Sequence, residues 1–252
     1  MALVRWLPLI ALLGLWELVA DLNLVTPFML PALSDVCQRI WDDTMSGDLP
    51  LNLAATLWRT LAGFAISAVL GVGLGMAMSQ NRIVRWFFDP LISLGFPIPK
   101  VAFLPIMVLW LGLFDLSKIT MIVFNDIFVV ITATLAGVEG VEKELVWSAR
   151  NFGTNGRRLV WDVLLPAALP QILTGLQVAM PVALILAIIV EMTMGGYGVG
   201  AAMQQSGRMA DSPGVFAGII EIGVVGYALV RLMALARRRL LAWHAEAAVS
   251  DT

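Results

Sequence analysis

Residues 147–166 have the sequence WSARNFGTNGRRLVWDVLLP, a polar and basic stretch that separates two long apolar ones. The apolar stretches extend over residues 119–137 and 172–194. A helix needs about 20 mostly apolar residues to cross the hydrocarbon layer of a bilayer, and both stretches come close to that length. We therefore predict that the quoted segment connects two transmembrane helices.

The rest of the chain repeats this alternation. The 252 residues are 60% hydrophobic and 13% charged, which is about half the charged fraction of a soluble domain. Further spans are expected over residues 3–20, 56–78, 86–114 and 215–236. The first is expected to be an uncleaved span rather than a secretory signal, because no small-residue cleavage site follows it. The sequence thus predicts an all-α membrane protein with about six transmembrane helices in a single domain, residues 1–252.

The third expected span, residues 86–114, is too long for one straight crossing. It contains Pro97, Pro99 and Pro105, and each proline removes a backbone donor and strains the turn before it. We therefore predict a kinked or broken helix. Such breaks persist in a membrane only where they are buried in protein or line a cavity, so Pro97 and Pro99 are candidate residues of a substrate pathway.

Basic residues predict the orientation, because lysine and arginine are concentrated on cytoplasmic loops. If the N-terminus is inside, ten basic residues near span ends are cytoplasmic and three lie on outer loops. The ten are Arg5, Arg82, Arg85, Lys143, Arg150, Arg157, Arg158, Arg237, Arg238 and Arg239, and the three are Arg39, Lys118 and Arg208. Both termini are therefore expected in the cytoplasm.

A short outer helix is predicted between the first two spans. Ser34 is expected to cap its N-terminus, because a serine hydroxyl accepts hydrogen bonds from the free amides of a first turn. Val36, Cys37, Ile40 and Trp41 follow on one face. We expect this helix to lie along the outer membrane surface.

The connection over residues 138–171 is long for a helix bundle. Its charged residues alternate with Leu145, Val146 and Trp147, which predicts a short amphipathic helix. Gly153 and Gly156 then predict a tight turn before a second helix returns to the membrane. A short helix of this kind suits the transmission of motion from a cytoplasmic partner, and the glycine turn lets it enter a groove closely.

The same segment resembles a motif of a known family. Trp147-Ser148-Ala149, then Gly153, then VLLP at 163–166 are similar to the Glu-Ala-Ala loop of binding-protein-dependent ABC importer permeases. Trp147 and Ser148 stand where that family has glutamate and the first alanine. The resemblance implies a coupling helix that docks into an ATPase subunit. The residues expected to make this contact are Trp147, Ser148, Ala149, Arg150, Asn151, Phe152, Gly153, Thr154 and Pro166.

Other stretches, in the same order along the chain, resemble the nitrate, taurine and alkanesulfonate branch of that family. They are 28–31 (FMLP), 57–64 (LWRTLAGF), 89–91 (DPL), 97–99 (PIP), 104–105 (LP), 110–112 (WLG), 117–119 (SKI), 165–170 (LPAALP), 173–176 (LTGL) and 191–192 (EM). The resemblance implies a type I importer permease with the MetI-like fold in the bacterial inner membrane. It also implies a homodimer, two cytoplasmic ABC ATPase subunits and a periplasmic solute-binding protein.

Four polar residues within the spans are candidates for the pathway, since ionisable groups are costly there. Lys100 either attracts an anionic solute or pairs with Asp126 or Glu191. Asn125 and Asp126 either hydrogen-bond between helices or line the pathway. For Glu191 we favour a hydrogen bond to the glycine-rich loop 195–200. Gly71 and Gly75, one turn apart, predict a small-residue face for close helix packing.

Several functions are disfavoured by the sequence. A net charge of -2 indicates no nucleic-acid-binding surface, and a single cysteine, Cys37, provides neither an internal disulfide nor a metal cluster. No phosphate-binding G-x-x-x-x-G-K-[ST] motif occurs, so the chain is expected to hold no cofactor, and ATP and Mg are expected on a partner subunit. An intramembrane enzyme is disfavoured because the only histidine, His244, lies in the tail.

One alternative is a secondary transporter driven by protons through Asp126, Glu191 and Glu221. We favour the importer permease, because the long connection would have no purpose in that alternative. The resemblance suggests a small organic or inorganic anion as solute, such as a sulfonate, nitrate or carboxylate.

Overall fold

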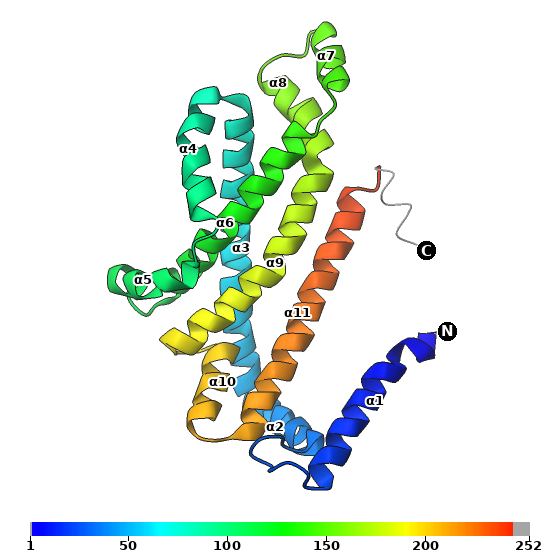
Figure 1. The fold of residues 1–252 in the computed structure, drawn as a ribbon, viewed down its shortest axis with the longest axis vertical. Helices are drawn as coiled ribbons and strands as arrows, with labels where there is room; N and C mark the ends of the chain where they lie inside the picture. The colour runs from blue at the N-terminus through cyan, green and yellow to red at the C-terminus, as the bar shows by residue number, and fades with distance from the viewer. Residues whose placement is uncertain (1, 244–252) are drawn as a thin grey trace. The chain divides into compact units, whose positions relative to one another are not determined.

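The structure, a computed structural model, describes residues 2–243 (Figure 1). Over these residues the chain forms helices and no strand. The α-helices are α1 (Ala2–Asp21), α2 (Leu33–Ser46), α3 (Asp48–Gln80), α4 (Arg82–Gly95), α5 (Leu104–Leu111), α6 (Asp115–Glu139), α7 (Lys143–Asn151), α8 (Arg157–Leu159), α9 (Leu165–Met194), α10 (Val199–Arg208) and α11 (Ser212–Leu240). A 3₁₀-helix, Lys100–Phe103, precedes α5, and a π-helix, Val160–Leu164, precedes α9.

The long helices contain the expected spans. Among the described residues, four helical stretches are long and apolar enough to cross a bilayer, namely α3, α6, Arg157–Met194 and α11. A fifth crossing results if the pair Arg82–Gly95 and Lys100–Leu111 counts as one span. The two parts of this pair meet at 96°, so the predicted break at Pro97 and Pro99 is confirmed. Helix α1 covers the first expected span.

The described residues divide into two compact units, each built from two separate parts of the chain. The first unit contains the residues up to Trp58 together with Ala187–Val225. The second contains Arg59–Leu186 together with the residues that follow Val225. The single domain expected over residues 1–252 stays a prediction.

A seam of small residues joins α3 to α6 in the second unit. A Cβ added to Gly71 would lie 2.7 Å from Val130 Cβ, and one added to Gly75 would lie 2.7 Å from Thr134 Cβ. The later glycine of α3 meets the later residue of α6, so α3 and α6 run in the same direction. This confirms the packing face predicted from Gly71 and Gly75, whereas Gly73 faces open space.

Helix α9 packs on α6 in the opposite direction. A Cβ on Gly175 would overlap Ala133, and a Cβ on Gly137 would lie 3.0 Å from the carbonyl oxygen of Ala168. The later residue of α9, Gly175, thus meets the earlier residue of α6, Ala133, which shows that the two helices are antiparallel. Close backbone approach of this kind is what small residues provide between membrane helices, where apolar burial gives little driving force.

The predicted cap of α2 is wrong. Helix α2 begins at Leu33, its N-cap is Ala32, and no side chain of the cap residue bonds its first turn. Instead, the carboxylate of Glu17 on α1 accepts hydrogen bonds from the amides of Leu33 (2.6 Å) and Ser34 (3.3 Å). A carboxylate there satisfies free donors and also interacts favourably with the helix dipole.

A larger side chain in the seam tests the packing of the second unit. We expect Gly71→Leu to lower the thermal unfolding temperature of the detergent-solubilised protein, because overpacking of this kind costs about 1–3 kcal/mol. Gly73→Leu is the matched control, since its side chain enters open space. Equal unfolding temperatures for the two variants would contradict the seam.

Candidate functional site

Helix α7 in the connection between α6 and α9 has one side packed against its own chain. Val146 and Ala149, three residues apart, contact a buried cluster of apolar side chains. That cluster consists of Met76, Val138, Leu159, Leu164, Ala168 and Ile172. Figure 1 shows α7 beyond the ends of α6 and α9. The predicted amphipathic helix is confirmed, and the cluster fixes it on the helices that carry it.

The other side of α7 and the residue after it present apolar groups to the surroundings. The exposed fraction is 57% for Trp147 and 88% for Phe152, and Leu145 is also exposed. Grouped exposed side chains of this size mark sites of interaction with a protein or a membrane. Ser148, Arg150 and Asn151 lie beside them and are exposed as well, which gives this surface a polar rim.

The turn after α7 is a Schellman motif. The amide of Thr154 donates to the carbonyl oxygen of Ala149 (3.0 Å), and the amide of Gly153 donates to that of Arg150 (2.9 Å). In this motif the residue at the position of Gly153 adopts the left-handed conformation, and Gly153 has φ +85°. The predicted glycine turn is therefore present.

A cavity of about 540 Å³ lies between the start of α7 and the helix that returns to the membrane. Its lining includes Leu145 of α7 together with Asp162, Pro166 and Trp243. Pro166 thus lies near the first turn of α7, although α8 and the π-helix separate it from Gly153 in the sequence.

The proline break packs against α6. The Nζ of Lys100 donates to the carbonyl oxygen of Phe96 and lies 4.9 Å from the ring centroid of Phe128. Lys100 is buried, and these contacts stabilise its ammonium through a hydrogen bond and cation–π attraction. The pairing with Asp126 that the sequence allowed is absent, because Asp126 Oδ2 has no hydrogen-bond partner among the described residues.

Asn125 and Asp126 lie near the middle of α6. The side chain of Asp126 is fully buried, and its Oδ1 accepts a hydrogen bond from Asn125 Nδ2 at 3.0 Å. Asp126 lies one turn from both Ile122 and Val130, which face glycines of α3. The carboxyl group therefore belongs to the helical face that packs on the seam.

Glu191 fastens the glycine-rich loop of the first unit. Its buried carboxylate accepts hydrogen bonds from Thr56 Oγ1 (2.8 Å) and from the amide of Gly200 (3.2 Å). Thr56 in turn accepts from the amide of Val199, and Asn52 Oδ1 accepts from the amide of Gly198. The loop hydrogen bond favoured from the sequence is present.

Two cations are buried, and the sequence analysis missed the burial of Lys118. Lys118, expected on an outer loop, lies in α6 and is only 2% exposed, because α6 begins at Asp115, earlier than predicted. Arg59 is also buried, and its Nε donates to Asp115 Oδ1 at 2.8 Å. The acidic residue at the start of α6 is the signal that could have indicated a partner for Arg59.

Comparison with known families identifies one match. Residues 67–242 match the family model described as binding-protein-dependent transport system inner membrane component.

Relatives that match more than nine tenths of this chain are named as transport permease proteins. The taurine transport system permease protein TauC of Escherichia coli is 33% identical over 94% of this chain and 88% of its own length. The putative aliphatic sulfonates transport permease protein SsuC of Bacillus subtilis is 29% identical over 92% and 84%. The formylaminopyrimidine transport permease protein ThiX of Halalkalibacterium halodurans is 31% identical over 92% and 92%.

Solved structures share the fold. An amino acid ABC transporter crystallised with histidines has a TM-score of 0.64 at 18% identity, covering 78% of this chain and 95% of that one. An inward-facing MetNI methionine ABC transporter has a TM-score of 0.55 at 16% identity, covering 71% and 93%. The expected MetI-like fold is confirmed.

Substitutions in the glycine-rich loop test its attachment to Glu191. We expect Gly198→Ala to lower the unfolding temperature in detergent clearly, because the new Cβ would overlap the Glu191 carboxylate and φ is +134°. Gly195→Ala is the comparison variant, since it also places an alanine at a positive φ, +73°, but causes no steric overlap. A smaller loss for Gly198→Ala than for Gly195→Ala would show that the carboxylate does not hold the loop.

Proposed function

We propose a mechanism from one premise: this chain belongs to the family of binding-protein-dependent transport system inner membrane components. It is the permease subunit of an ABC importer and a multi-pass protein of the inner membrane, not an enzyme. Permeases of this family work with an ATPase subunit and a solute-binding protein. The relatives give no support to a proton-driven transporter that uses Asp126, Glu191 and Glu221.

The surface around α7 is assigned to the ATPase subunit. The observation that carries this assignment is that α7 has one packed face and one exposed face. Val146 and Ala149 pack on the buried cluster, whereas Trp147 and Phe152 are exposed. An anchored helix with exposed aromatic side chains suits a partner's groove, because buried aromatic anchors dominate interface energies. Ser148, Arg150, Asn151, Gly153 and Thr154 complete the contact, with Pro166 beside it.

Motion then passes from the ATPase to the spans. Two copies of the permease form the pathway, two ATPase subunits bind ATP and Mg, and both chain termini lie in the cytoplasm. When the ATPases close, α7 and the buried cluster beneath it move together, because the cluster joins α7 to α3, α6 and α9. The broken span opens or closes the path on one side of the membrane at a time.

The solute is a small anion such as a sulfonate, in keeping with the names of the taurine and aliphatic sulfonate relatives. Pro97, Pro99 and Lys100 in the broken span, and Asn125 on α6, are assigned to the pathway, whereas Asp126 belongs to the face of α6 that packs on α3. Glu191 is assigned to the loop that it fastens, since its carboxylate already accepts from Thr56 and Gly200.

Replacement of Gly153 tests the coupling. We expect Gly153→Trp to abolish ATP-driven uptake while ATP hydrolysis persists, because the bulky group blocks close entry of the turn into the ATPase. No atom outside the turn lies within 4 Å of the new Cβ, so the substitution causes no clash within the chain, and the backbone strain at φ +85° is matched in the control. Gly47→Trp is the matched control, with φ +87° and open space. Intact coupled transport by Gly153→Trp in proteoliposomes contradicts the mechanism.

Truncation of Phe152 tests the anchor itself. We expect Phe152→Ala to weaken binding of the ATPase subunit about tenfold or more, because burial of a phenylalanine contributes about 1.5–3 kcal/mol. Phe114→Ala is the control, since Phe114 is also well exposed but lies outside the connection. Binding is measured by surface plasmon resonance on nanodisc-embedded permease, and unchanged affinity for Phe152→Ala refutes the anchor.

A further inference from the structure

Helix α11 has an exposed face within its membrane-spanning part. Only 6% of its most apolar stretch is buried in the chain, against 56% for the corresponding stretch of Arg157–Met194. One set of exposed residues recurs at spacings of three and four residues, which places them on one side of the helix. This outward face consists of Val224, Tyr227, Ala228, Arg231 and Leu235.

Arg231 is turned into the span rather than towards the nearer membrane surface. It lies six residues before Arg237, so its Cα is about 9 Å from the basic end of α11. A long basic side chain at such a depth can reach the headgroups by extending towards that end. Instead, Arg231 Nε donates to Tyr227 Oη at 2.9 Å, and Arg231 Cζ lies 5.3 Å from the centroid of the Tyr227 ring. Tyr227 precedes Arg231 by one turn, so it holds the charge deeper in the span.

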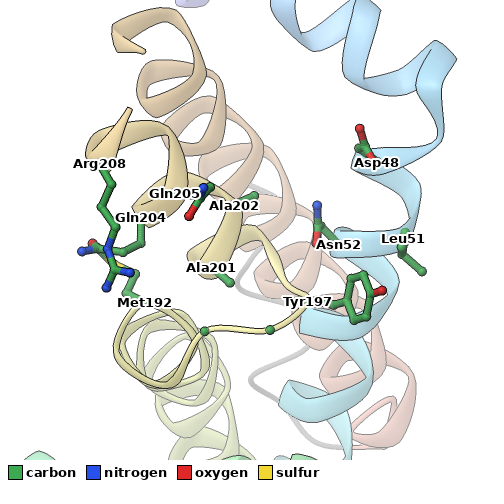
Figure 2. Close-up of a pocket in the computed structure, with 12 residues that line it drawn as sticks. Asp48, Leu51, Asn52, Met192, Tyr197, Ala201, Ala202, Gln204, Gln205 and Arg208 are labelled. Carbon is green, nitrogen blue, oxygen red and sulfur yellow. The ribbon is translucent and has the colours of Figure 1, made fainter. Parts of the chain in front are cut away.

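No carboxylate compensates this charge. Arg231 forms no ion pair with any residue that the structure describes. Three other arginines do form ion pairs, namely Arg39 with Asp43 and Asp211, Arg59 with Asp115, and Arg85 with Glu139. Arg208, in α10, shares the lining of a cavity with Asp48 (Figure 2). Arg231 differs from all four, because it lies within a span and its face carries no acidic residue.

An uncompensated arginine within a span faces water or another protein surface, because exposure to lipid is costly. A second copy related by two-fold symmetry would bring the same face towards this one. That face carries no acidic residue, so the second copy would add another arginine and not a counter-ion. Two guanidinium groups that face each other require water and an anion between them.

The free part of the guanidinium matches an oxoanion. Because Nε donates to Tyr227, the two terminal nitrogens of Arg231 remain to donate side by side. Such a fork fits two oxygens of a sulfonate, a carboxylate or nitrate. The ammonium of Lys100, by contrast, already donates to the carbonyl oxygen of Phe96 and lies against the ring of Phe128. Arg231 is therefore the better placed cation for a solute.

We propose that Arg231 is the anion-binding residue of the translocation pathway and that Tyr227 positions it. The inference rests on the proposed function, because the pathway is the one that two permease copies form. It identifies the group that recognises the anionic part of the solute, and two copies present this group from both sides of the path.

Water access and local charge are measured by thiol labelling of the permease with its ATPase subunits in nanodiscs. Cys37→Ser removes the native thiol, and Ala228→Cys places a new one on the outward face, three residues before Arg231. The reagents are sulfonatoethyl methanethiosulfonate, an anion, and trimethylammonioethyl methanethiosulfonate, a cation. We expect both to react and the anion to react faster. Arg231→Gln should lower the ratio of the anion rate to the cation rate about tenfold.

Oxoanion binding is measured as protection of the same thiol. Ethanesulfonate at millimolar concentration should slow labelling more than chloride does at equal ionic strength, and Arg231→Gln should abolish this difference. Arg231→Lys should keep the rate ratio but lose the protection, because lysine keeps the charge and lacks the fork. Tyr227→Leu should lower the rate ratio although the arginine remains, because Arg231 can then extend towards the membrane surface.

Arg239→Gln is the matched control, because it removes an exposed arginine from the basic end of the same helix and should change neither readout. The proposal is overturned if Ala228→Cys reacts with neither reagent, since lipid or protein then covers the face. It is also overturned if Arg231→Gln leaves the rate ratio or the protection unchanged. Retention of the ATPase subunits is scored separately. Their absence from the unaltered protein would refute the proposed function, whereas the labelling rates decide the role of Arg231.

Discussion

The absence of water from the hydrocarbon layer is the constraint on which the rest of this structure depends. Backbone amides and carbonyls there must find partners within the protein, which makes helices the default. The break after α4 is the described exception, and it shows how the cost is met. In a continuous helix, the carbonyl of Phe96 would bond to the amide of residue 100; at the break, the ammonium of Lys100 takes that place. A buried lysine therefore has a structural reason to follow the two prolines.

Much of this architecture could be predicted because it depends on local patterns. Spans follow from apolar length, the break follows from Pro97 and Pro99, and the amphipathic helix α7 follows from the alternation ahead of Gly153. The seam at Gly71 and Gly75 was predictable for the same reason, because residues one turn apart share a helix face. In each case the decisive residues lie within a few turns of one another.

The features that were missed depend on partners far away in the chain. The N-terminus of α2 is capped by Glu17 rather than by Ser34, and no local pattern contains that pairing. Glu191 finds Thr56, which lies 135 residues earlier. Arg59 finds Asp115, which lies 56 residues later. Pathway chemistry is therefore harder to predict than topology.

Helix α9 contributes residues to two separate sets of contacts. Near its start it packs on the cluster that holds α7, and near its end it carries Glu191, which fastens the glycine-rich loop. Pro170 and Pro181 lie between these points and each removes one backbone hydrogen bond from the helix. Helix α9 is therefore continuous from Leu165 to Met194, although it lacks two of its backbone hydrogen bonds. The chain keeps one unbroken helix here despite two prolines, whereas Pro97 and Pro99 break the span after α4.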